Sequence, residues 1–303
     1  SNIMKKVIVI TGPTAVGKTK LSIEIAKRLQ TDIINGDAYQ IYQKMNIGTA
    51  KPTDDEKQGV IHHYMDFLDS GKTYSIAEFQ KGVRECIDDL TSKNKVPLIV
   101  GGSGLYIDSV IKNYQFLEEK RSNEQSKYDS LTNEELHQVL ANLDPDKASE
   151  IHPNNRKRVL RAIELISSNV DNTSRSKKNE LVYDALIIFL NDNRESLYDR
   201  INKRVDKMLA DGLIEEVKNI GINNYSMTSK VAIGYKEVIQ YLNNEIDYNE
   251  MVELIKKNSR HYAKRQFTWF KNQDNCQVVN INLEDFNKTI DEVYNLITVF
   301  LSK

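Results

Sequence analysis

The sequence feature that most constrains the fold is a glycine-rich loop near the N-terminus. It reads Gly12-Pro13-Thr14-Ala15-Val16-Gly17-Lys18-Thr19, which has the spacing Gly-x4-Gly-Lys-Thr. The β-branched run 7–10 precedes it and is typical of a buried parallel strand. Residues 20–29 follow it, with leucine and isoleucine at helical spacing. A loop of this form between a strand and a helix predicts a P-loop.

A P-loop binds phosphate for a physical reason. Its glycines let backbone N–H groups turn inward around phosphate oxygens, and the helix N-terminus adds partial positive charge. We therefore expect this loop to hold a diphosphate or polyphosphate group, with Lys18 neutralising phosphate and Thr19 reaching Mg²⁺. The alternative is a relic loop in a non-catalytic domain, and the motif alone does not identify the phosphate compound.

Strand-like and helix-like segments alternate on both sides of the middle of the chain. Further apolar runs predict strands at 33–34, 97–100, 185–190 and 278–281. Amphipathic patterns predict helices at 75–90, 194–209, 248–270 and 284–301, the first with Ser75 as N-cap and Glu78 completing a capping box. This alternation indicates an α/β fold with a parallel sheet and right-handed crossovers.

The pattern changes between about residues 116 and 178, where no strand-type run occurs. Helix-like pieces appear instead at 133–143 and 156–166, followed by a polar stretch at 167–176. We therefore predict a P-loop-type parallel sheet core flanked by helices, formed by residues 1–115 and 181–303. Residues 116–180 form an inserted helical domain, joined through a flexible polar segment.

Composition excludes several classes of protein. The 303 residues are 40% hydrophobic and 28% charged with a net charge of -1, which is ordinary for a soluble globular protein and gives no general attraction to nucleic acid. Two cysteines are too few for a disulfide framework, and His62-His63 lacks a third metal ligand at a recognisable spacing. No apolar run reaches membrane-spanning length, so we expect a cytoplasmic protein without membrane contact.

Asp37 directly follows the second predicted strand. Its carboxylate is expected at the carboxyl edge of the sheet, where the P-loop lies, as a general base or a metal-associated acid. The alternative is a turn residue after Asn35-Gly36. The third predicted strand ends in Gly101-Gly102-Ser103-Gly104 without an acid, which argues against an ordinary ATPase or GTPase.

Basic residues cluster in two predicted helices. One cluster is Arg156-Lys157-Arg158 with Arg161, and the other runs from Lys256 to Lys271 with Tyr262, Gln266 and Trp269 interleaved. Such clusters are either solvated faces or contacts to a nucleic-acid backbone. Arg200 and Arg204 share a helix face, either to clamp a phosphate or to pair with Asp199 or Asp206.

These segments, taken together, resemble those of the bacterial tRNA dimethylallyltransferases over nearly the whole chain. The P-loop belongs to the resemblance, and the block Ile47-Gly48-Thr49-Ala50-Lys51-Pro52 is far more specific. The other matching blocks are Gly36-Asp37-Ala38-Tyr39-Gln40-Ile41-Tyr42, Tyr74-Ser75-Ile76-Ala77-Glu78-Phe79, Val100-Gly101-Gly102-Ser103-Gly104-Leu105-Tyr106, Ile151-His152-Pro153-Asn154, Ile233-Gly234-Tyr235-Lys236-Glu237 and Ala263-Lys264-Arg265-Gln266.

The resemblance implies transfer of a dimethylallyl group from dimethylallyl diphosphate to the exocyclic amine of the adenine 3′-adjacent to the anticodon in tRNA, with release of pyrophosphate. It implies that the P-loop, Gly12 to Thr19, holds the donor's diphosphate. Asp37 matches the proposed general base, while Lys18, Thr19 and Arg204 match positions that hold the leaving pyrophosphate with Mg²⁺ as cofactor. Thr14 and Ser103 match positions that line the donor or acceptor channel.

The resemblance also implies that the insertion closes on the tRNA anticodon stem-loop and that the target base flips into the channel. The implied tRNA-contacting residues are Asp37, Ala38, Tyr39, Gln40, Ser103, Lys157, Arg158, Val159, Leu160, Arg161, Val231, Ala232, Ile233, Gly234, Tyr235 and Lys236. We expect a monomer.

Two positions depart from the family pattern. Ala38 stands where a serine is usual, which removes a hydroxyl contact, and Asn155 stands where an aspartate is usual, which removes a charge contact or a helix cap. Neither is a predicted catalytic residue, so we expect activity to survive. A P-loop small-molecule or nucleotide kinase and a non-catalytic RNA-binding module are the rival interpretations.

Overall fold

The computed structural model describes residues 3–116, 128–168 and 180–303. The chain divides into two compact units: one comprises Ser1–Ile111 with Tyr183–Lys303, and the other is Lys112–Val182. The sequence predicts these boundaries at 115/116 and 180/181, a few residues from those of the structure. The predicted polar segment 167–176 lies mostly outside the described residues, apart from the two residues that end the last helix of the smaller unit.

The larger unit is built on a six-stranded sheet in which every neighbouring pair of strands is parallel. In sheet order the strands are β3 (His62–His63), β2 (Ile33–Asn35), β4 (Leu98–Val100), β1 (Lys6–Thr11), β5 (Asp184–Asn191) and β6 (Cys276–Asn280). The predicted parallel α/β sheet is confirmed. The edge strand β3 was not predicted, because two histidines carry no apolar signal and its pairing with β2 defines it.

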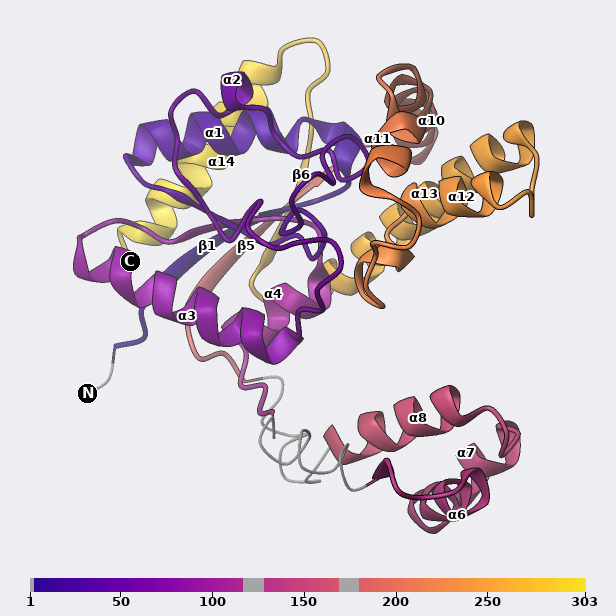
Figure 1. Ribbon diagram of the computed structural model, residues 1–303. Coiled ribbons are helices and arrows are strands. Elements are labelled where there is room, and N and C mark those ends of the chain that lie inside the picture. The colour runs from indigo at the N-terminus through magenta and orange to yellow at the C-terminus, as the bar shows by residue number, and fades with distance from the viewer. Residues whose placement is uncertain (1–2, 117–127, 169–179) are drawn as a thin grey trace. The chain divides into compact units, whose positions relative to one another are not determined.

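Helices cover both faces of this sheet. On one face α1 (Lys18–Leu29) packs beside α14 (Phe286–Leu301), and on the other α3 (Ile76–Ser92) packs beside α4 (Gly104–Ile111) (Figure 1). The core contains apolar residues of β1 and β5, which are almost completely inaccessible to water, packed with apolar residues of α1 and α14. Ser75 caps α3 as predicted, since its hydroxyl accepts the Glu78 N–H at 3.0 Å.

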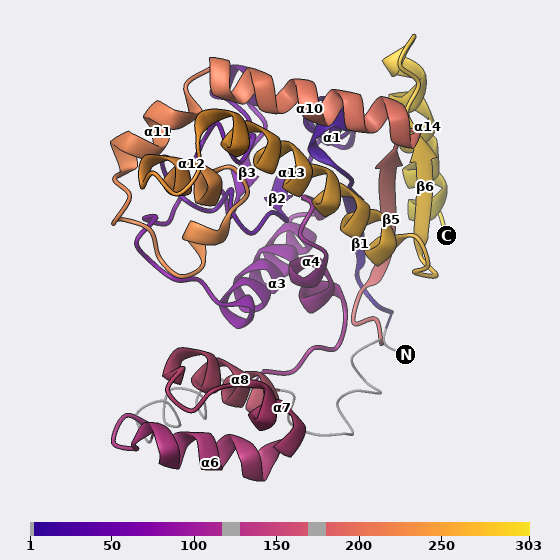
Figure 2. The same cartoon turned by 90° about the vertical axis from the view of Figure 1, so that its right-hand side faces the viewer.

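A second hydrophobic cluster lies beside the sheet and contains the loop residues Ile41, Tyr42 and Met45. It is formed by α10 (Arg194–Ala210), α11 (Leu213–Ile220), α12 (Tyr235–Leu242) and α13 (Tyr248–Phe270), and α10 and α13 run side by side (Figure 2). The short elements are α2 (Asp54–Lys57) and the 3₁₀ turns η1 (Thr14–Val16) and η2 (Ser229–Val231). Both long helices were predicted, whereas α11 and α12 were not, because each spans only eight residues, fewer than the stretch over which helical periodicity is read.

In its described residues the smaller unit contains α6 (Asn133–Leu143), α7 (Pro145–Glu150) and α8 (Arg156–Ser168) around its own apolar core. Helices α6 and α8 were predicted, and α7 was not. Asn155 still caps α8, because its side-chain oxygen accepts the Arg158 N–H at 3.3 Å. The departure from aspartate at this position therefore removes a charge and keeps the cap.

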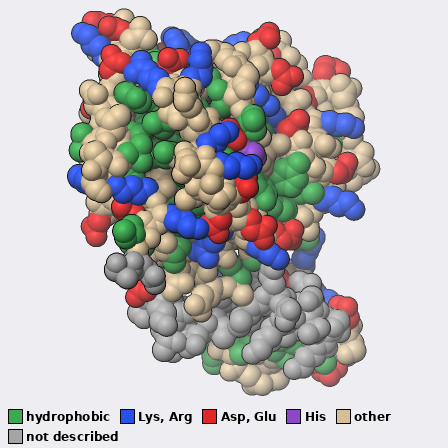
Figure 3. Space-filling model, turned by 90° about the vertical axis from the view of Figure 1, so that its left-hand side faces the viewer, with side chains coloured by type: hydrophobic (Ala, Val, Ile, Leu, Met, Phe, Trp, Pro, Cys, Tyr) green, Lys and Arg blue, Asp and Glu red, His purple; other side chains and the backbone are tan. Residues whose placement is uncertain are grey.

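The surface of the chain carries charges of both signs. On the face shown in Figure 3, Lys and Arg side chains are scattered among Asp and Glu, with apolar side chains between them. No helix within the described ranges is long and apolar enough to span a bilayer.

Two glycines bring the ends of β2 and β4 into contact. The Gly36 N–H donates to the Val100 carbonyl at 2.7 Å, and the Ser103 N–H donates to the Gly36 carbonyl at 3.2 Å. A Cβ on Gly101 would lie 2.1 Å from the Gly36 carbonyl carbon and 2.6 Å from the Asp37 nitrogen. Only glycine at this position lets the segment that carries Asp37 lie against β4.

We expect Gly101→Ala to lower the free energy of unfolding by about 3 kcal/mol, the upper end of the usual cost of overpacking. Backbone atoms must move to admit the methyl group. Denaturant unfolding measures the change. Gly71→Ala is the matched control, since its Cβ approaches only the flexible end of Asp69 at 3.1 Å. Equal stability of the two variants would contradict the close approach at Gly101.

Candidate active site

The predicted P-loop has the backbone that phosphate binding requires. Gly17 has φ +81°, a left-handed conformation that favours glycine, and it is the N-cap of α1. A Cβ on Gly12 would lie 2.7 Å from the Leu190 carbonyl oxygen of β5. The Lys18 ammonium donates to the Gly12 carbonyl at 2.9 Å, which folds the side chain back over the loop. The loop and the first turn of α1 thus form one concave surface.

This surface opens into a pocket of about 590 Å³, which we call the phosphate pocket. Its lining contains more cations than anions. The cations are Lys18, Lys20, Lys51, Arg200, Arg204 and Lys207, and the anions are Glu56 and Asp211. Thr14, Ala15, Gly17 and Thr19 complete the wall on the P-loop side. A cationic pocket at a helix N-terminus is suited to a di- or polyphosphate.

Arg200 and Arg204 of α10 differ in their ionic partners. Each has a buried guanidinium nitrogen without a hydrogen-bond partner among the described residues, but Arg200 lies 3.8 Å from the buried Asp192 carboxylate, whereas no ion pair engages Arg204 in the same residues. The alternative that Arg200 or Arg204 pairs with Asp199 or Asp206 is wrong, because those carboxylates pair with Lys203 at 2.8 Å and Lys256 at 2.9 Å. Arg204 is therefore a cation left available to the pocket.

Lys18 is the other cation whose environment is unusual. The pKa of Lys18 is lowered to about 8, chiefly because its amine is removed from water; the carboxylate of Asp37 opposes this shift and the charge of Arg204 adds to it. A lysine in this state is charged at neutral pH but has lost solvation. An incoming phosphate anion would restore favourable interactions to both Lys18 and Arg204.

A second pocket of about 200 Å³ adjoins the first, and we call it the apolar channel. Its walls come mainly from α10, α13 and the loop before α12, and include Ile201, Val205, Met208, Ala232, Ile233, Ile255 and Ala263. Thr14, Arg204 and Met208 line both pockets, so the phosphate pocket and the apolar channel share one wall.

Asp37 lies in the wall of the apolar channel. Its Oδ1 accepts the N–H groups of Tyr39 at 2.8 Å and Gln40 at 3.1 Å. No hydrogen bond engages Oδ2 within the residues that the structure describes. The turn interpretation of Asp37 is confirmed, because Oδ1 shapes the turn, and the general-base interpretation stays a prediction, for which Oδ2 is available.

Ser103 joins the Asp37 segment to the end of β4. Its hydroxyl accepts the Ala38 N–H at 2.8 Å, and its side chain is buried. Because this contact uses the backbone of Ala38, the alanine at this position does not weaken it. Tyr262 lies nearby, and burial, together with the negative charge of Asp37, raises the pKa of its phenol.

The predicted contact segment 231–236 divides between channel wall and protein core. All of its members except Tyr235 line the apolar channel. Tyr235 is completely buried and donates to the Glu216 carboxylate at 2.6 Å, so its side chain holds the fold together. Among the apolar side chains of this segment, that of Val231 is the most exposed, with 48% of its surface accessible to water.

The predicted contact segment of the insertion divides in a similar way. Lys157, Arg158 and Arg161 are exposed on α8, whereas Val159 is completely buried and Leu160 packs against the core of the smaller unit. Arg156 is structural, because its guanidinium donates to the carbonyls of Leu131 at 2.7 Å and Tyr128 at 2.8 Å. Three cations of this helix therefore remain for an external partner.

The polar and aromatic residues interleaved in α13 bind the protein itself. Tyr262 and Gln266 both donate to the Gly102 carbonyl, at 3.2 and 3.0 Å, and the Trp269 indole donates to Asp108 at 3.0 Å. Arg260 donates to Asn202 at 2.7 Å. The nucleic-acid interpretation of α13 is thus limited to its exposed cations, such as Lys257, Lys264 and Arg265.

Two acidic residues of interest escaped the sequence analysis. Asp192 directly follows β5 and is 8% exposed, and its position after an apolar run is the signal that identified Asp37. Glu216, in α11, gave no signal, because its partners are backbone N–H groups far away in the sequence. Within the described part of the chain, no cluster of three His, Cys, Asp or Glu residues could hold a metal ion, and His63 pairs with Asp32 at 2.9 Å.

Comparisons with known proteins give one consistent result. A family profile described as IPP transferase matches residues 40–273. The tRNA dimethylallyltransferase of Staphylococcus haemolyticus is 44% identical over 308 residues, covering 98% of this chain and 93% of that protein. The crystal structure of a tRNA delta(2)-isopentenylpyrophosphate transferase from Staphylococcus epidermidis matches with a TM-score of 0.72 and 43% identity, covering 97% and 99% of the two chains. A eukaryotic dimethylallyltransferase described as acting on tRNA matches with a TM-score of 0.73 and 28% identity, covering 91% and 74%.

The pKa of Lys18 leads to a test of the phosphate pocket. Because the pKa of Lys18 is lowered to about 8, the amine is charged below pH 8 and neutral above it. We expect the affinity for pyrophosphate to be constant below pH 8 and to fall by up to about tenfold per pH unit above it. Calorimetric titration of pyrophosphate from about pH 6.5 to about pH 9.5, which brackets the pKa of Lys18, measures the change in affinity. In Lys18→Arg the charge persists, so the inflection should disappear; an unchanged inflection would assign it to another group or to the ligand.

Proposed function

This chain belongs to the IPP transferase family, and on that premise we propose how its residues carry out the reaction. The chain transfers a dimethylallyl group from dimethylallyl diphosphate to the exocyclic amine of a tRNA adenine and releases pyrophosphate. The adenine we propose is the one 3′-adjacent to the anticodon. The observation that carries the assignment of residues is the shared wall of a cationic pocket and an apolar channel that contains Asp37.

The donor has one charged end and one apolar end, and the two pockets match it. The diphosphate binds in the phosphate pocket, against the N–H groups of the P-loop, Lys18 and Arg204. The five-carbon tail extends past Thr14 into the apolar channel, where Val205 and Ile255 replace water around it. The reacting carbon then lies between the phosphate pocket and Asp37.

Asp37 is the general base. As the adenine nitrogen forms its bond to the first carbon of the prenyl chain, the bond from that carbon to the diphosphate oxygen breaks. The nitrogen becomes more acidic as it gains the new bond, and Oδ2 of Asp37 takes its proton. Oδ1 cannot move freely, because it accepts the N–H groups of Tyr39 and Gln40.

Lys18 and Arg204 stabilise the leaving group. Negative charge grows on the diphosphate as the carbon–oxygen bond breaks, and both cations line the phosphate pocket. Neither has an anionic side chain bound to it among the described residues, so their charge is directed at the phosphate. Their contribution increases toward the transition state, which is the condition for lowering the barrier.

Thr19 is the residue we assign to Mg²⁺. It lies in the first turn of α1 and lines the phosphate pocket, whose only carboxylates in the described lining are Glu56 and Asp211. This donor set fits Mg²⁺, which takes few protein ligands and prefers phosphate oxygens and water. Bound there, the ion would neutralise part of the diphosphate charge.

The anticodon stem-loop of tRNA is the proposed acceptor. Lys157, Arg158 and Arg161 of the smaller unit are exposed cations suited to a phosphate backbone. The target base leaves the stack and enters the apolar channel beside Tyr39. We propose that the protein acts as a monomer in the cytoplasm.

Loss of the base should abolish turnover and preserve binding. We expect Asp37→Asn to lower the rate of transfer by about 10²–10⁴-fold, because the amide keeps the turn and cannot accept the proton. The assay uses labelled dimethylallyl diphosphate, Mg²⁺ and an unmodified anticodon stem-loop, with and without ATP. Label should enter the RNA without ATP, which a kinase would not produce.

Asp55→Asn, at an exposed carboxylate of α2, is the control. Full activity of Asp37→Asn would remove Asp37 as the base. Lack of any transfer by the unaltered chain to a stem-loop with adenines at the target position would contradict the proposed function itself.

The cations of α8 should account for part of the salt dependence of RNA binding. We expect the triple replacement Lys157→Ala, Arg158→Ala, Arg161→Ala to reduce the slope of log K against log salt by ~0.9 for each RNA phosphate that these cations neutralise in the parent. Filter binding with the stem-loop at salt concentrations from about 50 to about 200 mM measures this slope. Lys147→Ala, in the same unit, should leave the slope unchanged. An unchanged slope in the triple variant would exclude this face of α8.

A further inference from the structure

The block 47–52, the most specific part of the sequence resemblance, has no role in the chemistry described above. In the structure the loop 46–51 forms part of two walls at once. Gly48 and Thr49 line the apolar channel, while Asn46, Ile47 and Lys51 line the phosphate pocket. The position of this short loop therefore affects both ends of the donor.

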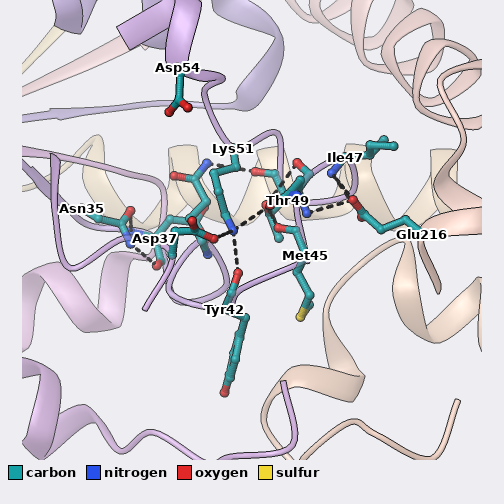
Figure 4. Close-up of polar contacts among 12 residues, drawn as sticks. Asn35, Asp37, Tyr42, Met45, Ile47, Thr49, Lys51, Asp54 and Glu216 are labelled. Carbon is teal, nitrogen blue, oxygen red and sulfur yellow. Dashed lines mark hydrogen bonds and ion pairs between the residues drawn. The ribbon is translucent and has the colours of Figure 1, made fainter. Parts of the chain in front are cut away.

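A carboxylate of α11 binds the backbone at the start of this loop. Glu216 accepts the N–H groups of Asn46 at 3.0 Å, Ile47 at 2.9 and 3.1 Å, and Gly48 at 3.5 Å (Figure 4). Three successive backbone N–H groups that converge on one point form an anion-binding concavity. Here the anion is part of the protein.

Tyr235 completes the arrangement. Its hydroxyl donates to Glu216 at 2.6 Å and accepts the Gly48 N–H at 3.2 Å. Burial and the charge of Glu216 raise the pKa of Tyr235, which keeps the phenol protonated and able to donate. A Cβ on Gly48 would lie 2.4 Å from the Tyr235 ring, so the glycine of the block is required for this approach.

The loop is linked to the catalytic carboxylate through Gln40. The Gln40 side chain donates to the Thr49 carbonyl at 2.9 Å, and the Gln40 N–H donates to Oδ1 of Asp37 at 3.1 Å. Lys51 fixes the other end of the loop, with bonds to the Tyr42 carbonyl at 2.6 Å and to Asp66 at 2.7 Å. A continuous set of hydrogen bonds thus runs from Glu216 to Asp37.

We propose that Glu216 is a positioning residue for prenyl transfer: its carboxylate holds the loop 46–51 so that, through Gln40, Asp37 faces the donor. Glu216 touches neither substrate nor the reacting atoms. This inference rests on the proposed function of the site, because it concerns the placement of the base and the donor.

The test is Glu216→Gln in the full chain. The amide has the shape of the carboxylate but presents an NH₂ donor to N–H groups that need an acceptor. We expect the single-turnover rate with saturating donor and stem-loop to fall at least about tenfold, which corresponds to about 1.4 kcal/mol of barrier. Glu215→Gln, an exposed neighbour on the same helix that pairs only with Lys218 in the described residues, should stay within about twofold, below 0.5 kcal/mol by the same conversion.

A double-mutant cycle separates positioning from general destabilisation. Gln40→Met removes the link between the loop and Asp37. If Glu216 acts through Gln40, the two substitutions together should slow transfer little more than the slower single variant, whereas independent effects multiply. The melting temperature is measured for each variant. If Glu216→Gln is unfolded at the assay temperature, Tyr235→Phe takes its place, with the same comparison to Glu215→Gln and the same cycle with Gln40→Met.

Three results would overturn the inference. The first is a transfer rate for Glu216→Gln equal to that of Glu215→Gln. The second is a loss of rate that the unfolded fraction of Glu216→Gln explains in full. The third is a double variant in which the effects of Glu216→Gln and Gln40→Met on the rate multiply. If the unaltered chain transfers no prenyl group, the proposed function itself fails. This outcome differs from failure of the inference on Glu216, which is judged only by comparing variants with an active parent.

Discussion

Parallel pairing of the central strands is the constraint on which the site depends. Since β2, β4, β1 and β5 all run in the same direction, their carboxyl ends meet at one edge of the sheet. That edge brings together the P-loop after β1, Asp37 after β2 and Ser103 after β4. If one of these strands ran in the opposite direction, the loop that follows it would lie at the other edge of the sheet, away from the site. The close contact of Gly36 with Gly101 fixes the spacing between two of these loops.

Electrostatics then gives this edge its specificity. The structure removes Lys18 and Arg204 from water without an ion pair in the described residues, which is unfavourable until an anion arrives. The diphosphate supplies that anion, so part of its binding free energy compensates for the desolvation of the protein. The adjoining apolar channel places the apolar side chains Ile201, Val205 and Ile255 beside this cationic pocket.

The sequence was sufficient for local features. The P-loop, the helices α6, α10 and α13, and the strands β1 and β5 follow from spacing and periodicity, because their determinants lie within a few residues of one another. Asp37 could be identified as a candidate because it directly follows an apolar strand. The departures at Ala38 and Asn155 proved mild for reasons that only the folded chain reveals: Ala38 binds Ser103 through its backbone, and Asn155 retains the cap of α8.

Tertiary structure decided the assignment of the other charged residues. Arg200 and Arg204 look alike in the sequence and both line the phosphate pocket, yet Arg200 also approaches Asp192, which follows β5, while Arg204 also lines the apolar channel. The aromatic side chains interleaved with the cations of α13 bind Gly102 and Asp108, while cations such as Lys257 and Lys264 stay exposed. Glu216 carries no sequence signal at all, since its partners lie about 170 residues earlier in the chain. The sequence by itself predicted the P-loop and the apolar strands of the sheet, since these depend on local backbone conformation. Only the folded chain decided which charges remain available, since that depends on partners brought together from distant segments.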